Sequence, residues 1–232
     1  HNYYLKPPNI SWGIIFPLSW TLMQLIRSSG GVNLSDIREM LPGLMAMSVL
    51  FGTTSMLAVT ITFERKGRSF DRLLLAPISL STMVAAKLSG AILFGLLNAF
   101  VPVIFAAFFV DLAGINWGSV LLAVLLIAVT STLLGLVIAV SAKEVFEAQT
   151  FSNFFRFPML FLCGLFLPIS SLPVFLRPLS YLLPLTYGTD LLNGAILGVS
   201  LLSPVLCILI LLAFTGGLFA YCQYNIRRKW IL

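Results

Sequence analysis

Long apolar segments constrain this chain more than any other feature of its sequence. Residues 118–141, GSVLLAVLLIAVTSTLLGLVIAVS, contain no charged side chain, and neither do 41–63, 88–110 and 201–225. A helix needs about 20 predominantly apolar residues to cross the hydrocarbon core of a bilayer. Only 9% of the residues are charged, against about 25% in a typical soluble domain. The sequence therefore predicts an integral membrane protein rather than a soluble domain.

Two further segments complete the predicted set of spans. Residues 12–26 are apolar but short, and residues 151–169 are interrupted by Arg156 and Pro158. With these two, the chain has six predicted transmembrane helices. The fold class is therefore an all-α integral membrane protein, and we expect a single transmembrane domain over residues 1–232.

The segment between the last two spans has a different character. Residues 170–198 are apolar, but they hold three prolines and two charged residues. Such a composition argues against one straight spanning helix. We expect a re-entrant pair of short helices that dip into the membrane and return. The alternative is a surface loop with amphipathic pieces.

The basic residues indicate the orientation of the chain. Six spans place both termini on the same side, and ten Lys or Arg residues fall on that side: Lys6, Arg65, Lys66, Arg68, Arg72, Lys87, Lys143, Arg227, Arg228 and Lys229. Three fall on the other side: Arg27, Arg38 and Arg177. Cytoplasmic loops carry the excess of basic residues in membrane proteins. The predicted localisation is therefore a multi-pass protein of the plasma or inner membrane with both termini in the cytoplasm.

Several functional classes lack their sequence requirements. The net charge of +6 is spread between the spans and the C-terminus, so no nucleic-acid partner is expected. The sequence has no phosphate-binding loop, no zinc-protease motif and no nucleophile-elbow motif. Its single histidine is His1, where an initiator methionine is absent, so residues before it are expected. We predict no catalytic residue, no metal site and no cofactor in this chain.

Polar residues inside the spans are candidates for lining a translocation path. The candidates are Thr53, Thr54, Asn98, Thr130 and Asn153. Such residues more often bond their own helix backbone or a neighbouring helix. Arg156 is expected to snorkel to the cytoplasmic surface, and an internal ion pair is the alternative.

The connection between the second and third spans is unusually charged. Residues 63–77, FERKGRSFDRLLLAP, hold four basic and two acidic residues. On a helix, Arg68, Asp71 and Arg72 share one face, and Phe70 lies with two leucines on another. This pattern predicts a short amphipathic helix that docks a cytoplasmic partner. The alternative is a basic loop that only orients the chain.

This stretch also carries a family resemblance. ERKGRSFDRLLLAPIS, residues 64–79, resembles the motif E-[RK]-x-G-[ST]-x-[ED]-x-L-L-x-[ST]-P of ABC exporter permeases of the type-2 membrane family. Residues 161–196 are similar to the family's span, Gly-x-x-x-Pro, Leu-Pro, then Pro-Leu-Thr-Tyr and an acidic residue. Residues 11–24 give a weaker match. The motif departs from the family at Arg68 and Ala76.

The resemblance implies a role for each region. Residues 67–77 would be the coupling helix seated in an ABC ATPase subunit, with the coupling residues Glu64, Arg65, Gly67, Arg68, Phe70, Asp71, Arg72, Leu73, Leu74 and Pro77. Residues 170–198 would be the re-entrant pair at the extracellular mouth, with the gate residues Pro168, Pro173, Arg177, Pro178, Pro184, Thr186, Tyr187 and Asp190. The implied partners are the ATPase subunit, which would hold ATP and Mg, a second copy or a homologous permease, and membrane lipid.

Two other functional classes stay open at this stage. A secondary transporter or channel without an ATPase usually has carboxylates inside its spans or an internal repeat. The predicted spans contain no Asp or Glu and show no duplicated half. A membrane-embedded enzyme would need clustered catalytic groups at one membrane face. We expect a permease for a hydrophobic or amphipathic compound.

Overall fold

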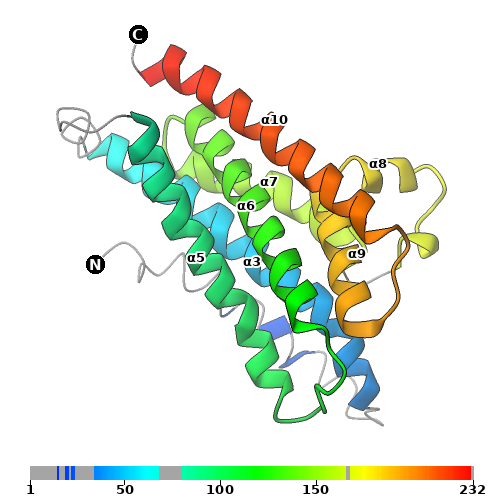
Figure 1. Cartoon of the computed structure of the whole chain (residues 1–232). Coiled ribbons are helices and arrows are strands. Elements are labelled where there is room, and N and C mark those ends of the chain that lie inside the picture. Colours follow the sequence, from blue (N-terminus) through cyan, green and yellow to red (C-terminus); the bar gives the residue numbers. More distant parts are fainter. Residues whose placement is uncertain are drawn as a thin grey trace.

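A computed structural model describes residues 15, 19–20, 22–23, 34–67, 80–165 and 168–230 of the chain. Within these ranges every regular element is a helix, which agrees with the predicted all-α class. The elements are α3 (Leu34–Lys66), α5 (Leu80–Ala106), α6 (Trp117–Ser141), α7 (Val145–Leu162), η2 (Ile169–Ser171), α8 (Arg177–Tyr181), α9 (Pro184–Leu197) and α10 (Pro204–Trp230). Figure 1 shows their arrangement.

Four described helices are long and apolar enough to cross a membrane. Their spanning parts are Ile37–Lys66, Thr82–Ala106, Trp117–Ser141 and Pro204–Ile226. These correspond to the predicted spans at 41–63, 88–110, 118–141 and 201–225. Most of the predicted first span, 12–26, lies outside the described residues.

The predicted bounds of the fifth span, 151–169, are wrong. The helix is α7, which begins at Val145 and ends at Leu162. Pro158 lies inside the helix without ending it. The helix ends instead before Gly164, whose φ of 75° lies in the left-handed region that glycine tolerates best. The polar residues of its first half keep α7 less apolar than the four spanning helices.

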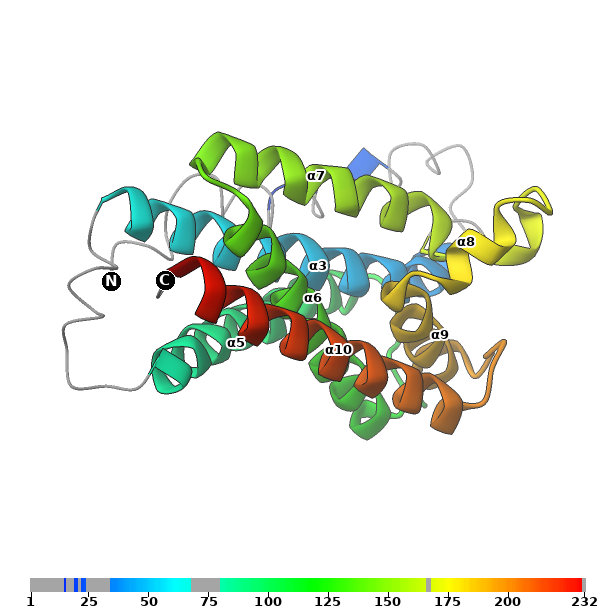
Figure 2. The same ribbon diagram turned by 90° about the horizontal axis from the view of Figure 1, so that it is seen from above.

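Helix α3 forms the centre of the bundle. It packs against α5, α6, α7 and α9, and Figure 2 shows α7 on one side of it and α5 and α10 on the other. In its most apolar stretch 94% of the residues are buried, against 17% in α10. Close packing depends on small residues, because a Cβ added at Gly135 of α6 would lie 2.9 Å from the Thr54 carbonyl oxygen. Movement of α3 would therefore affect most of the bundle.

The bundle has two ends, which we name after the ends of α3. At the Lys66 end, α3 meets the first turns of α5 and the last turn of α6. At the Leu34 end, Arg38 donates to the carbonyl oxygens of Ala113, before α6, and Ile196, on α9. The short helices α8 and α9 lie towards this second end (Figure 1).

The segment 170–198 forms separate short helices rather than one long helix. Helix α8 begins with Arg177 and Pro178, and α9 begins with Pro184. Proline suits the first turn of a helix because the first amide groups have no partner within the helix. Pro184 lacks the amide proton that a continuous helix would need there. The re-entrant course of these helices through a membrane stays a prediction.

Candidate functional site

At the Lys66 end, Arg65 fixes α3 to the end of α6. Its guanidinium donates to the carbonyl oxygens of Ala139 and Ala142, at 3.1 and 3.2 Å. These carbonyls belong to the last turn and the C-cap of α6, where the backbone carries a partial negative charge. A cation there satisfies carbonyl groups that have no partner within the helix.

Glu64, one residue earlier, fixes α3 to α5. Its carboxylate forms an ion pair with the ammonium group of Lys87, and both side chains are largely buried. Glu64 and Arg65 therefore join three helices at the end of α3. The remaining predicted coupling residues lie outside the described residues: Arg68, Phe70, Asp71, Arg72, Leu73, Leu74 and Pro77.

At the Leu34 end, Asp190 of α9 holds the connection to α10. Its two carboxylate oxygens accept hydrogen bonds from the backbone amides of Leu201 and Leu202, at 2.7 and 3.0 Å. The Cys207 thiol lies 3.6 Å from the same carboxylate. Asp190 is 5% exposed. The prediction that this charge meets a polar partner rather than lipid is confirmed.

Arg177 holds the turn before α8 in a comparable way. Its guanidinium donates to the carbonyl oxygens of Leu172 and Ser170, at 3.1 and 2.7 Å. The prediction of a polar partner is confirmed here too, while the bonds of Asp190 go to backbone amides rather than to Arg177.

The other predicted gate residues shape this region locally. Thr186 donates to the Ser180 carbonyl oxygen, and Tyr187 donates to that of Tyr181 at 2.6 Å, so α9 is bonded back onto α8. Pro168 precedes η2 and Pro173 follows it, while Pro178 and Pro184 stand in the first turns of α8 and α9. The gating role of all eight residues stays a prediction.

The Leu34 end also contains a pocket of about 630 Å³. It lies between the first turns of α3, the end of α7, α9 and the connection to α10. Its charged lining residues are Glu39 and Asp190, and its other polar side chains include Tyr181, Thr186 and Asn193. We call it the Leu34-end pocket. Its volume is within the range of about 300–1,000 Å³ that is common for small-molecule sites.

The predicted path-lining residues lie in the packed interior. Thr53 and Thr130 donate to the carbonyl oxygens four residues earlier in their own helices, at 2.8 Å each, and Thr54 bonds its own helix in the same way. Thr130 also lies 3.1 Å from the Thr215 hydroxyl of α10. Asn98 is buried and its amide nitrogen has no hydrogen-bond partner. The contacts of the three threonines match the packing alternative, and path lining stays a prediction for all five candidates.

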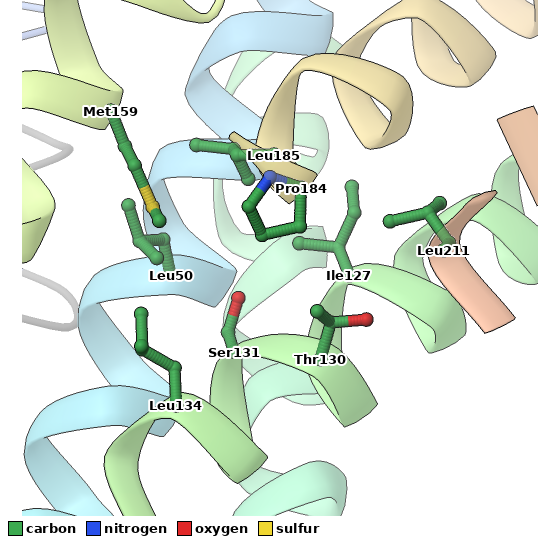
Figure 3. Close-up of a pocket in the computed structure, with 9 residues that line it drawn as sticks. All are labelled: Leu50, Ile127, Thr130, Ser131, Leu134, Met159, Pro184, Leu185 and Leu211. Atoms are coloured by element: carbon green, nitrogen blue, oxygen red, sulfur yellow. The ribbon is translucent and has the colours of Figure 1, made fainter. Parts of the chain in front are cut away.

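A small cavity beside Thr130 shows how tightly this interior is filled. Its volume is about 10 Å³, and Ser131, Ile127 and Pro184 are among its lining residues. Figure 3 shows the Ser131 hydroxyl directed towards Pro184, with leucine side chains around it. Such a volume holds at most about one water molecule. The cavity beside Thr130 therefore has no room for a larger molecule.

The expected snorkelling of Arg156 is wrong, and so is the alternative of an internal ion pair. Its side chain is 0% exposed. Its guanidinium donates to the Ser55 hydroxyl of α3 at 2.6 Å, contacts the Asn153 amide oxygen at 3.5 Å and lies 5.1 Å from the centre of the Phe51 ring. Among the described residues the one ion pair is Glu64–Lys87. Snorkelling fails because Arg156 faces α3 rather than the surface.

The sequence contains a pattern that indicates the burial of Arg156, although the charge of this residue alone does not. Gln149, Ser152, Asn153 and Arg156 follow the spacing i, i+3, i+4, i+7 and therefore share one face of α7. Phe154 and Phe161 lie on the opposite side, where they are 70 and 56% exposed. On the polar side of α7, Ser152 and Arg156 are buried and Gln149 and Asn153 are half-buried, whereas Phe154 and Phe161 are exposed. We call Ser55 and the four polar residues of α7 the polar α3–α7 interface.

Comparisons with known proteins identify the family of this chain. The model of the ABC-2 type transporter family matches residues 2–197. The inner membrane transport permease YadH of Escherichia coli K12 is 27% identical over 224 residues, which cover 97% of this chain and 87% of that protein. Nodulation protein J of Sinorhizobium fredii is 29% identical over 181 residues, which cover 74% of this chain and 68% of that protein. Together with its apolar helices, these similarities make the chain a multi-pass membrane protein of transport type. The chain belongs to the ABC-2 type transporter family.

Proposed function

We propose that this chain is the transmembrane permease subunit of an ATP-driven exporter. Two copies, or one copy and a homologous permease, form the translocation path in the plasma or inner membrane. A separate ABC ATPase subunit binds ATP and Mg on the cytoplasmic side, where both termini of the permease lie. Family membership supports this role over a secondary transporter, a channel or a membrane enzyme.

The observation that carries the proposal is the anchoring of the charged segment at the Lys66 end. Glu64 and Arg65 both belong to the central helix α3. Glu64 forms an ion pair with α5, and Arg65 donates hydrogen bonds to α6. A force on residues 67–77 is therefore passed to three helices at once. A loop that only oriented the chain would need its charges but not these bonds.

In the proposed mechanism the ATPase moves the permease through this segment. ATP shifts the ATPase towards its closed state only if that state binds ATP better than the open state does. The coupling helices then move as rigid levers and carry α3 with them. The spans separate or meet at the two-fold axis, and the re-entrant helices at the Leu34 end gate the extracellular mouth.

Co-purification of the ATPase with the tagged permease tests the proposal. Phe70→Ala should release the ATPase or uncouple ATP hydrolysis from transport, because buried aromatic anchors often contribute about 2 kcal/mol or more to an interface. Lys66→Ala is the matched control and should have little effect, because an exposed charge contributes less than about 1 kcal/mol. Intact assembly and export in Phe70→Ala would reject the docking role.

A further inference from the structure

Arg156 is a buried cation that forms no ion pair with any of the described residues. Of the eight acidic residues in the sequence, none lies within residues 41–63 of α3 or 148–162 of α7. Glu64, the acidic residue of α3 closest to Ser55 in sequence, is already paired with Lys87. The positive charge between α3 and α7 is therefore not neutralised within the described part of the chain.

The polar α3–α7 interface also has unused hydrogen-bonding capacity. The Nε atom of Arg156 and the amide oxygen of Gln149 are both buried and have no hydrogen-bond partner. Native proteins pair nearly all such groups, because each unpaired one costs about 1–3 kcal/mol. These atoms lie on the same face of α7 as Asn153, which contacts Arg156 directly.

The depth of Arg156 makes a purely structural role expensive. Its partner Ser55 precedes Lys66 by 11 residues, which is about 16 Å along a helix at 1.5 Å per residue. An arginine near the membrane centre costs about 2.5–3.5 kcal/mol on insertion scales. One charge-assisted hydrogen bond to Ser55 returns about 1.5–3 kcal/mol. A well-packed apolar residue at position 156 would therefore stabilise the interface about as much as the arginine does.

We propose that the polar α3–α7 interface binds the anionic group of an amphipathic molecule, with the Arg156 guanidinium as its cationic partner. The inference rests on the proposed transport function and specifies the substrate class: a phosphate or carboxylate joined to an apolar part. A planar guanidinium with a free Nε–H can form the two parallel bonds that such anions accept.

Entry of the anion requires α7 to separate from α3, because Arg156 is 0% exposed. The apolar part of the molecule then extends out of the interface, away from the guanidinium. With α7 packed against α3, the Ser55 hydroxyl and the Phe51 ring contact the guanidinium where the anion would bind.

The test uses the full permease, with and without its ATPase, in nanodiscs of zwitterionic phosphatidylcholine. The probes are labelled dihexanoyl-phosphatidic acid and the matched neutral dihexanoylglycerol. Wild-type permease should bind the anionic probe at least about tenfold more tightly than the neutral one, as expected for one charge-assisted hydrogen bond. Equal binding of the two probes by the wild type would overturn the proposal, even if no variant folds.

Three variants locate the effect. Arg156→Gln should remove the preference for the anionic probe, and Arg156→Lys should keep part of it, because an ammonium cannot form two parallel bonds. Lys143→Gln removes one exposed cation near the start of α7 and should leave the preference unchanged. A preference that survives in Arg156→Gln, or disappears equally in Lys143→Gln, would overturn the assignment.

Two further arms identify the source of the anion. Release of the probe on addition of ATP to the permease–ATPase complex indicates a transported molecule. Competition by phosphatidylglycerol in the nanodisc, without release by ATP, indicates a resident lipid. The permease can bind the probe without the ATPase. Failure of the permease–ATPase complex to form would therefore reject the proposed function, whereas this inference could still be tested by binding of the probe to the permease alone.

Discussion

The two ends of the bundle use their charged residues differently. At the Lys66 end, Glu64 and Arg65 of α3 bind helices α5 and α6. At the Leu34 end, Arg177 and Asp190 bind backbone groups of the short connections around α8 and α9. The first end joins long helices to one another, whereas the second fixes irregular backbone.

In the proposed function, the Lys66 end transmits force from the ATPase, whereas the Leu34 end holds irregular backbone in place. In the proposed mechanism, the bonds between long helices pass a force on residues 67–77 to α3, α5 and α6. Bonds to backbone groups keep broken helices ordered beside the Leu34-end pocket without tying them to the far end. The two ends should therefore respond differently to substitution.

The largest loss of stability is expected at Asp190. Asp190→Ala leaves the amides of Leu201 and Leu202 without their acceptor. Loss of two charge-assisted hydrogen bonds should lower the free energy of unfolding by about 3 kcal/mol or more. Unfolding in mixed detergent micelles measures this, with the exposed Asp111→Ala as the matched control. Equal losses in both variants would remove the structural role of Asp190.

A smaller loss is expected at the Lys66 end. Lys87→Met leaves the largely buried Glu64 carboxylate unpaired, which should cost about 2 kcal/mol. Adding Glu64→Gln should restore most of that stability, because no unpaired charge then remains. A double-mutant cycle over the two positions gives the coupling energy. Additive losses without restoration would show that the pair does not join α3 to α5.

The smallest loss is expected at Arg177. Its bonds to Leu172 and Ser170 lie partly at the surface, where water can replace them. Arg177→Met should therefore cost only about 1 kcal/mol. The same unfolding measurement tests this, and Arg177→Lys should lose less stability than Arg177→Met. A loss equal to that of Asp190→Ala would contradict the ranking within the Leu34 end.

The sequence predicted the parts of the fold that depend on hydrophobicity alone. Helices α3, α5, α6 and α10 follow from uncharged apolar runs that a membrane span requires. The short helices α8 and α9 follow from prolines, which suit first turns and interrupt helix interiors. These signals are local, so one sequence is sufficient to recognise them.

The features that the sequence did not predict depend on which neighbour a helix faces. The charge of Arg156 alone favours a position at the surface. Its burial depends on Ser55, which lies 101 residues away in the chain. The bonds of Asp190 to Leu201 and Leu202 likewise depend on how the chain turns before α10. The Leu34-end pocket is lined by separate segments between Glu39 and Leu202, so no single segment indicates it.

Photocrosslinking tests the central claim, that the Lys66 end docks an ABC ATPase, most directly. The photoreactive residue p-benzoylphenylalanine replaces Phe70 in one version of the permease and Phe175, which is 78% exposed before α8, in the other. After irradiation of intact cells, we expect a crosslink to the ATPase from position 70 and none from position 175. A crosslink to the ATPase from position 175, or from neither position while export continues, would contradict it.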